Sequence, residues 1–362
     1  MDAAQKAKHI YLQLLDFLRN NKSCVLATVT ATQGSTPQKA GSSAIYWLKG
    51  LLAGTVGGGA VELAIGEMAA DAIHTQKSGY FSFDLHNDIS DTEAAICGGG
   101  MSILLDANTA GNLQILESMK EADDKRIHGV LITVCSSCLP DSAQIQRFWV
   151  TIDNLKNIPS QIPADPIIAA TEMLTRRNPD DFREMVLPGS NEGEEKLVFL
   201  ESVVPMPQLI IAGAGHVGKA LSHLGKLLGF EVIVWDDRPE FANKTSLPEA
   251  DKIICGTLDE TLGKLHVDRD SFIVIVTRGH KNDADVLRKF LGSKAGYIGM
   301  IGSRKKIAQV RESFLKSGWA TIDQWEKIYT PIGLEIGSKT VQEIAVSIAA
   351  QLIQVRNQLK NQ

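Results

Sequence analysis

The stretch 209–237 constrains the fold of this chain more than any other part of it. It opens with an uninterrupted apolar run, 209–212, which is typical of a strand buried on both faces. The glycine-rich sequence GAGHVG follows at 213–218, and apolar residues then recur at helical spacing. A second apolar strand covers 230–235. This order of strand, glycine turn, helix and strand predicts a βαβ unit of the dinucleotide-binding type.

Each glycine of the turn has its own predicted task. Gly213 makes the tight turn, Gly215 allows a phosphate to approach the backbone, and Gly218 lets the helix pack closely on the strand. Asp236 follows the last glycine at close to the ~20 residues expected of an acid that binds a ribose hydroxyl. A glycine turn without a ligand is the plain alternative, but the complete strand–helix–strand context argues against it. We expect these residues, with His216 inside the turn, to bind a nucleotide-like ligand.

The 362 residues exceed what a single hydrophobic core usually supports, so two domains are expected. In the N-terminal part, strands are predicted at 23–32, 43–48, 51–56, 80–85, 101–105, 129–134 and 196–204. Helices are predicted at 4–20, 60–75, 113–122 and 165–181, and Ser78-Gly79 is expected to cap the second of them. The break Pro205-Met206-Pro207 marks the boundary. Beyond it, strands at 252–255, 271–277 and 297–301 alternate with helices. The sequence therefore predicts an α/β chain: an N-terminal α+β domain, 1–204, and a C-terminal Rossmann-like doubly wound parallel sheet, 207–362.

The net charge of −5 argues against a nucleic-acid-binding protein, because such proteins neutralise phosphates with excess Lys and Arg. No signal peptide and no apolar run of about 18 residues is present, which indicates a cytoplasmic protein without a membrane partner. Five cysteines are too few for a disulfide framework. The pair Cys135 and Cys138 lacks the second pair of ligands that a zinc site needs, so two incidental thiols are the simpler interpretation and no metal site is predicted.

Two glycine-rich loops in the N-terminal domain are candidate sites. Gly57-Gly58-Gly59 opens a helix, where unpaired N–H groups bind anions, and Glu62 lies one turn further on. Cys97 precedes three more glycines, which favours an accessible thiol and makes it a candidate catalytic residue. The alternative is that both loops are turns and that Cys97 is a small buried group.

Two further candidates follow strands of the C-terminal domain. Thr277-Arg278-Gly279-His280 lies at the edge where open α/β sheets bind ligands, and His280 is suited to proton transfer or metal binding. A solvated histidine near Asp283 and Asp285 is an equally good interpretation of that residue. The turn Gly302-Ser303-Arg304 presents N–H groups and cations to a phosphate, although cations at a helix N-terminus oppose the helix dipole.

These residues resemble the XdhC/CoxI family, the accessory proteins of molybdenum hydroxylases such as xanthine dehydrogenase. The resemblance covers nearly the whole chain and rests on segments 34–37 with Gly41, 54–59 with Glu62, 97–99, 213–218, 236–241, 277–280, 297–304, 331–337 and 343–345. The segment 331–337 is the most specific of them. Ala60 stands where many members have a cysteine, and Val341 replaces a common proline, while 107–200 matches least well.

The resemblance implies a non-catalytic chaperone that binds molybdenum cofactor, as molybdopterin or its nucleotide form, and assists its sulfuration and insertion into a hydroxylase. The implied partners are a xanthine-dehydrogenase-like hydroxylase and a cysteine desulfurase, and a homodimer is left open. The cofactor's phosphate suits the anion-binding turns, so Arg238 and Thr277 join the predicted cofactor-binding residues. Two alternatives remain: an NAD(P)-dependent oxidoreductase, with His280 as its candidate catalytic residue, and an interaction scaffold without a ligand.

Overall fold

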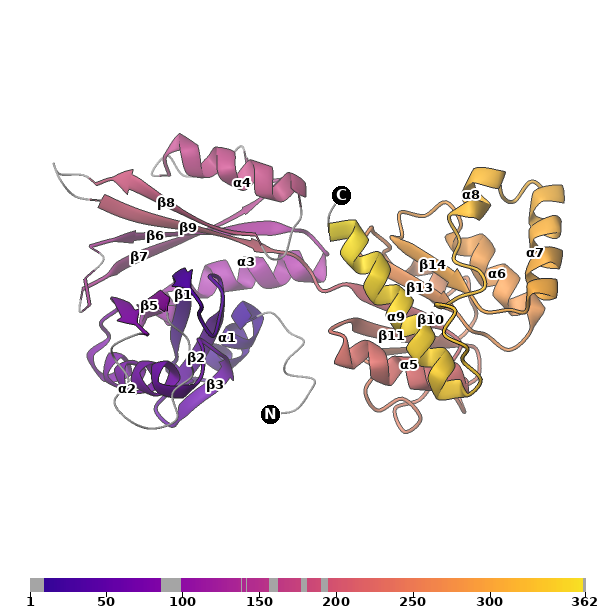
Figure 1. Ribbon diagram of the computed structural model, residues 1–362, viewed down its shortest axis with the longest axis horizontal. Coiled ribbons are helices and arrows are strands. Elements are labelled where there is room, and N and C mark those ends of the chain that lie inside the picture. Colours follow the sequence, from indigo (N-terminus) through magenta and orange to yellow (C-terminus); the bar gives the residue numbers. More distant parts are fainter. Residues whose placement is uncertain are drawn as a thin grey trace. The chain divides into compact units, whose positions relative to one another are not determined.

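The computed structural model describes residues 10–85, 99–137, 139–140, 142–155, 162–176, 181–189 and 195–360 (Figure 1). The chain divides into two compact units between Pro205 and Met206. Among the described residues no helix is long and apolar enough to cross a membrane.

The C-terminal unit is built on a five-stranded parallel sheet with the order β12-β11-β10-β13-β14, so the predicted Rossmann-like doubly wound fold is confirmed. The strands are β10 (Gln208–Ala212), β11 (Glu231–Asp236), β12 (Lys252–Cys255), β13 (Ser271–Ile275) and β14 (Tyr297–Met300). The helices are α5 (His216–Leu227), α6 (His280–Phe290), α7 (Arg304–Lys316), α8 (Ile322–Glu326) and α9 (Val341–Lys360).

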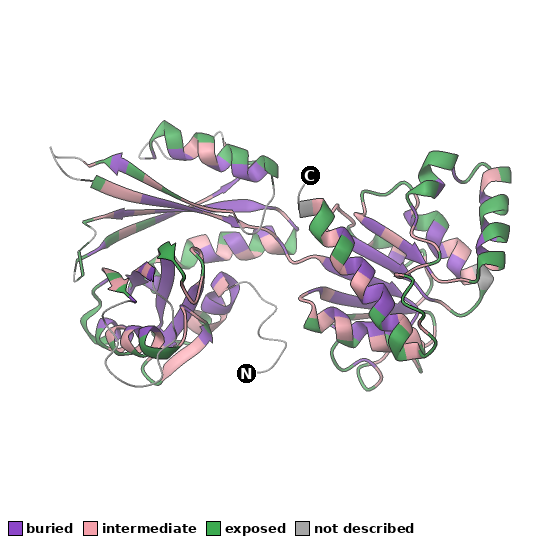
Figure 2. Ribbon diagram, viewed as in Figure 1, coloured by how far each residue is buried: buried purple, intermediate pink, exposed green. Residues whose placement is uncertain are grey.

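Helices cover both faces of this sheet because its strands are apolar on both sides. In β10, Leu209 and Ile211 face one core, which α5 and α9 complete with Leu221 and Ile348. Ile210 and its same-face neighbours contact the other core, which α6, α7 and α8 complete. Figure 2 shows the consequence: the central strands β10 and β13 are buried throughout, the edge strand β12 is exposed or half-buried, and the outer faces of the helices are exposed. The continuous apolar run at 209–212 is therefore explained by burial on both sides.

The N-terminal unit contains two antiparallel sheets. The first has the order β3-β2-β1-β5-β4, and the second has the order β7-β6-β9-β8. The strands are β1 (Val25–Gly34), β2 (Ser43–Trp47), β3 (Gly50–Gly54), β4 (Gly79–Asp84), β5 (Gly99–Asp106), β6 (Gly129–Ser136), β7 (Gln144–Thr151), β8 (Phe182–Pro188) and β9 (Glu195–Val203). The helices are α1 (Ile10–Arg19), α2 (Gly59–Thr75), α3 (Leu113–Asp124) and α4 (Ala164–Arg176).

The layers of this unit follow from alternating side chains. On β1, Val25, Ala27 and Val29 pack against α2, whereas Leu26 packs with α1 and α3 and meets Leu131 of the second sheet. The other face of the second sheet is covered by α4 (Figure 1). The unit is thus α+β, as the sequence predicts.

Three local expectations were wrong in detail. Helix α2 ends at Gln76 in the left-handed conformation (φ 54°), with its side-chain amide donating to the Ile73 carbonyl, so Ser78-Gly79 is not its cap. Asp181 is not helical, because its carbonyl accepts from Ser202 N at 3.0 Å beside the start of β8. The strands β7 and β8 had no counterpart among the predicted elements.

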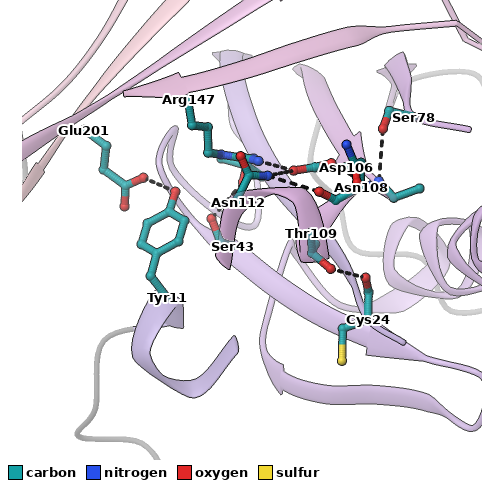
Figure 3. Close-up of polar contacts among 12 residues, drawn as sticks. Tyr11, Cys24, Ser43, Ser78, Asp106, Asn108, Thr109, Asn112, Arg147 and Glu201 are labelled. Atoms are coloured by element: carbon teal, nitrogen blue, oxygen red, sulfur yellow. Dashed lines mark hydrogen bonds and ion pairs between the residues drawn. The ribbon is translucent and has the colours of Figure 1, made fainter. Parts of the chain in front are cut away.

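A buried polar cluster joins α1 and both sheets of the N-terminal unit (Figure 3). Tyr11 Oη donates to Glu201 Oε2 at 2.6 Å, and Arg147 forms a buried ion pair with Asp106. Burial raises the pKa of Glu201 to about 7, although the Tyr11 hydrogen bond and the charge of Arg147 both act to lower it. The carboxyl group therefore binds its proton more tightly in the folded than in the unfolded chain.

This raised pKa predicts that Glu201 makes stability pH-dependent. The contribution is fully present below the unfolded pKa of 4.5 and is lost as the pH rises through about 7. The free energy of unfolding should fall by about 3 kcal/mol between pH 4.5 and pH 8 from this group alone. Glu201→Gln should remove that slope in urea titrations at several pH values, whereas Glu195→Gln, exposed on the same strand, should keep it. Equal slopes in wild type and Glu201→Gln would contradict the assignment.

Candidate functional site

The C-terminal unit places two predicted motifs side by side at the carboxyl edge of its sheet. Strand β10 leads into Gly213, and the neighbouring strand β13 leads toward Thr277. After β10 the chain continues to β11 on one side of β10, whereas β13 lies on its other side. The edge between β10 and β13 is therefore the topological switch point, where sheets of this kind bind ligands. Gly213 has φ +117°, and a Cβ there would lie 2.4 Å from the Val276 carbonyl oxygen. Only glycine allows the two loops to approach this closely.

Of the other two glycines of the turn, Gly218 is tightly packed and Gly215 faces open space. A Cβ on Gly218 would lie 1.9 Å from the Gly213 carbonyl oxygen, so this position is closed by helix–strand packing. A Cβ on Gly215 would meet nothing within 4 Å, and Gly215 is the N-cap of α5 without a side-chain cap. The start of α5, where His216 is exposed, is therefore accessible to an anion.

Asp236 has a different environment from the one expected of a ribose-binding acid. Its carboxylate accepts hydrogen bonds from Ala214 N (2.8 Å), Arg238 Nε (2.8 Å) and Arg238 Nη2 (3.0 Å), and the residue is 3% exposed. Burial opposes its charge, but the hydrogen bonds from Arg238 and the backbone outweigh that effect and lower the pKa of Asp236. Asp236 thus holds the glycine turn and Arg238 in place, while the Asp237 side chain, 52% exposed, is the accessible acid of the pair.

Arg238 is held on two sides. Besides its hydrogen bonds to Asp236, its guanidinium lies 3.9 Å from the centre of the Phe241 ring. These contacts fix the direction of the charge at the tip of β11. Arg238 can offer only its remaining N–H groups to a ligand.

Asp283 links the loop that follows β13 to the start of α7. Its Oδ1 accepts from Thr277 N at 3.0 Å and from Thr277 Oγ1 at 2.6 Å, and its Oδ2 pairs with Lys306. The Asp283 side chain is fully buried. The sequence signal for this role was weak, since Asp283 is one acid of a pair on a polar helix. Thr277 and Lys306 therefore serve to order their loops, and Lys306 is not a free cation for phosphate.

The turn before α7 leaves the side chains of Arg304 and Lys305 exposed, whereas Lys306 is engaged by Asp283. Ser303 is the N-cap of the helix and accepts from Lys306 N at 3.3 Å. The Arg304 side chain is 88% exposed and lies 3.2 Å from Glu335 Oε1. Gly302 packs against the Lys306 stem, with a Cβ position 3.1 Å from Lys306 Cδ. Of the predicted phosphate-binding residues, Arg304 is thus free to reorient toward an anion.

The segment 331–337, which carries Glu335, is anchored by α9. Gly333 N donates to Gln351 Oε1 at 2.9 Å, and Ser347 Oγ donates to the Leu334 carbonyl at 2.7 Å. Gly333 has φ +95°, and a Cβ there would lie 2.3 Å from Ser347 Oγ. Glu335 is therefore presented to Arg304 by a fixed backbone.

The N-terminal unit brings three of its glycine-containing motifs together. Gly34 pairs with Gly99 between β1 and β5, and a Cβ on Gly99 would lie 2.6 Å from the Ser35 carbonyl oxygen. A Cβ on Gly57 would lie 2.9 Å from Pro37 Cγ. The loop 34–37 therefore contacts both the glycine turn before α2 and the segment that follows Cys97.

The glycine turn before α2 has the features of an anion-binding nest. Gly58 and Gly59 have φ of +87° and +60°, and a Cβ on either would meet nothing within 4 Å. Glu62 lies in the first turn of the helix, with a buried Oε1 that has no hydrogen-bond partner within the described structure. The buried Tyr46 hydroxyl is also unpartnered there. Accessible N–H groups and buried polar atoms therefore occur at the same helix end.

Two predicted residues and one predicted side chain lie outside the described part of the structure. Cys97 and Cys138 lie outside the described residues, and the side chain of His280, the first residue of α6, is not described either. Cys135 is fully buried in β6. Among the described residues there is no group of three or more His, Cys, Asp or Glu suited to a metal ion.

Comparison with known proteins places both units in one family. The family model described as the XdhC Rossmann domain matches residues 209–352, and that of the XdhC and CoxI family matches residues 17–84. A protein of Bacillus subtilis (strain 168) that is named as a probable xanthine dehydrogenase subunit is 26% identical over 345 residues, 94% of this chain and 96% of that protein. Protein YqeB of Escherichia coli (strain K12), whose function is uncharacterized, is 29% identical over 170 residues, 47% of this chain and 31% of that protein.

A solved structure shares the fold. The crystal structure titled as a xanthine dehydrogenase from Bacillus halodurans has a TM-score of 0.71, 24% sequence identity, and 96% coverage of each chain. The matched segments include the glycine turn of the C-terminal unit and the loops 34–37 and 57–59 of the N-terminal unit. The chain belongs to the XdhC and CoxI family.

Proposed function

We propose that this protein is an accessory factor of a xanthine-dehydrogenase-type molybdenum hydroxylase. It binds molybdenum cofactor and assists sulfuration and insertion of that cofactor, with a cysteine desulfurase as the sulfur source. The observation that carries the proposal is the similarity over 94% of the chain to a protein named as a probable xanthine dehydrogenase subunit, together with accessible anion-binding turns in both units.

The residues of the C-terminal unit fit a phosphate-bearing ligand. The space over Gly215 is open, the start of α5 has unpaired N–H groups, and Arg304 is exposed. Asp237 is available to a ribose hydroxyl if the cofactor is in its nucleotide form. The bound cofactor would supply the molybdenum and sulfur chemistry, while these side chains bind and orient its phosphate end.

The N-terminal unit offers a second anion-binding turn at 57–59, next to the loop 34–37. Glu62 and Tyr46 have unpartnered polar atoms at this turn, so they are available to a ligand with both donor and acceptor groups. A pterin ring has such groups along its edge. We assign this turn to cofactor binding and Cys97 to the handling of sulfur.

The direct test is to purify the protein from a host that makes the cofactor. We expect fluorescent pterin and molybdenum to be released from the denatured protein in amounts comparable with the protein itself. A Cys97→Ala variant should bind cofactor but fail to support sulfuration. If pterin and molybdenum are both absent while NADH raises the thermal unfolding temperature, the chaperone proposal is wrong.

The second candidate is an NAD(P)-dependent oxidoreductase. It is favoured by the Rossmann strand order and by the open glycine turn at the switch point. Asp236 is engaged by Arg238 and Ala214, so Asp237 would have to bind the ribose of NAD(P) as well as that of a nucleotide-form cofactor, and this position does not favour either candidate. Steady-state reduction of NAD(P) by candidate substrates would support this alternative.

Arg304→Ala is expected to weaken binding of the phosphate-bearing cofactor by about tenfold or more, since a charge-assisted hydrogen bond is lost. The unfolding temperature should hardly change, because the Arg304–Glu335 ion pair is almost fully exposed. Arg311→Ala, an exposed arginine further along α7, is the matched control and should bind normally. Glu335→Gln frees Arg304 and should bind at least as tightly as wild type. Unchanged affinity in Arg304→Ala would remove this turn from the site.

A further inference from the structure

A cavity of about 490 Å³ lies between α5, the loop 246–249 and the start of α9. All of its lining residues belong to the C-terminal unit, in which α5 and α9 pack against each other (Figure 1). Its volume is within the range of small-molecule sites. No step of the proposed cofactor binding requires this cavity.

One face of α5 forms a wall of the cavity. Lys219, Ala220 and His223 lie three, four and seven residues after His216, so all four share that face. Across the cavity, Glu249 Oε2 lies 2.6 Å from His223 Nδ1 and thus closes one side. The cavity combines this polar rim with an apolar floor, to which Ala220, Leu247, Pro248 and Val341 contribute.

Ser222 is the feature that points to a ligand. The residue is 2% exposed and lines the cavity, yet its hydroxyl has no hydrogen-bond partner within the described structure. A buried hydroxyl without a partner costs free energy, and serines in helices usually donate to the preceding turn instead. A ligand with an acceptor atom at the base of the cavity would satisfy this group.

The electrostatic surroundings favour an anion. Two helices of the unit begin at the cavity: α5 with His216, and α9 with Val341 and Gln342. The N-termini of both helices carry positive partial charge. Lys219 adds a full positive charge and pairs with no carboxylate in the described part of the chain, while Glu249, the sole acid of the lining, is engaged by His223.

We propose that this cavity binds a small organic anion with an apolar body and a carboxylate or phosphate group. The apolar body contacts Ala220, Leu247 and Val341, and the anionic group lies between Lys219 and the helix N-termini. Ser222 donates to an acceptor on the ligand. Because His216 belongs both to this cavity and to the glycine turn, a ligand here would contact the cofactor-binding turn from its outer side.

The test uses the full-length protein with four probes: benzoate, phenyl phosphate, uncharged benzyl alcohol and inorganic phosphate. Imidazole NMR signals of His216 and His223, assigned by His→Gln substitution, report binding. Benzoate or phenyl phosphate should shift both signals saturably, with a Kd of about 1 mM or tighter. The probe with the lower Kd shows whether the cavity prefers a carboxylate or a phosphate group. Benzyl alcohol and inorganic phosphate should bind at least about tenfold more weakly.

Two variants locate the site. Lys219→Gln should weaken binding of the preferred anion about tenfold, and Ser222→Ala should weaken it several-fold. Lys305→Gln, an exposed lysine of α7 outside the cavity, should leave it unchanged. The inference is overturned if neither anion shifts the two histidines, if benzyl alcohol binds as tightly as the anions, or if Lys219→Gln and Lys305→Gln behave alike.

Discussion

The Gly218→Ala variant is expected to lose about 3 kcal/mol or more of stability in the C-terminal unit, or to fail to fold it. The added methyl group would lie 1.9 Å from the Gly213 carbonyl oxygen and 3.4 Å from Ile211 Cγ2. Neither neighbour can move without separating α5 from β10, because both belong to the strand and turn that the helix packs against. Urea unfolding of the full-length protein, followed by circular dichroism, measures the loss.

Gly215→Ala is the matched control within the same turn. Gly215 has φ −69°, which alanine adopts readily, and its Cβ would meet nothing within 4 Å. The variant should therefore unfold like wild type, yet bind the phosphate-bearing cofactor at least about tenfold more weakly, since the methyl group occupies the approach to the backbone. A stable Gly218→Ala, or a Gly215→Ala that binds cofactor normally, would contradict the roles assigned to these glycines.

Asp283→Ala should be comparably destabilising, with an expected loss of about 3–5 kcal/mol. The substitution leaves the ammonium group of Lys306, whose side chain is 13% exposed, without its carboxylate. It also removes the acceptor of the Thr277 backbone and hydroxyl hydrogen bonds. Thermal and urea unfolding of the purified variant measure this effect.

Asp285→Ala provides the comparison on the same helix. Asp285 is 41% exposed and reaches Arg288 only at 3.9 Å, so its removal should cost less than about 1 kcal/mol. Adding Lys306→Met to Asp283→Ala should recover part of the lost stability, because no uncompensated buried charge then remains. A loss below about 1 kcal/mol for Asp283→Ala, or no recovery in the double variant, would show that this buried pair does not hold the two turns together.

The fold of the C-terminal unit could be predicted because local patterns agree with the tertiary structure. The apolar run 209–212, the glycine turn and the amphipathic α5 each have the sequence that their burial requires. The strands β7 and β8 could not be predicted in the same way. Their residues alternate only partly between buried and exposed, so the period-two pattern of a strand is weak.

The gathering of the candidate motifs at one sheet edge could be predicted better than the contacts of their residues. The motifs at 213–218, 277–280 and 302–304 all follow strands of one parallel sheet, and strand ends of that kind gather at one edge. The partners of each side chain depend on tertiary contacts that no spacing reveals. Asp236 fits the ribose-binding position by count, but Arg238, two residues later, folds back onto it. Lys306 likewise follows a strand-to-helix turn and so fits a phosphate ligand by its position in the sequence. In the structure its ammonium group is paired with Asp283 instead.

The most direct test of the proposed function is the state of the cofactor in the partner enzyme. A xanthine-dehydrogenase-type hydroxylase should be produced with wild-type protein, with Gly215→Ala, and without the accessory protein, and its molybdenum and cyanide-releasable sulfur then measured per active site. We expect high molybdenum and sulfur contents with the wild type and a severalfold lower sulfur content in the other two preparations. Equal molybdenum and sulfur contents in all three preparations would contradict the accessory role.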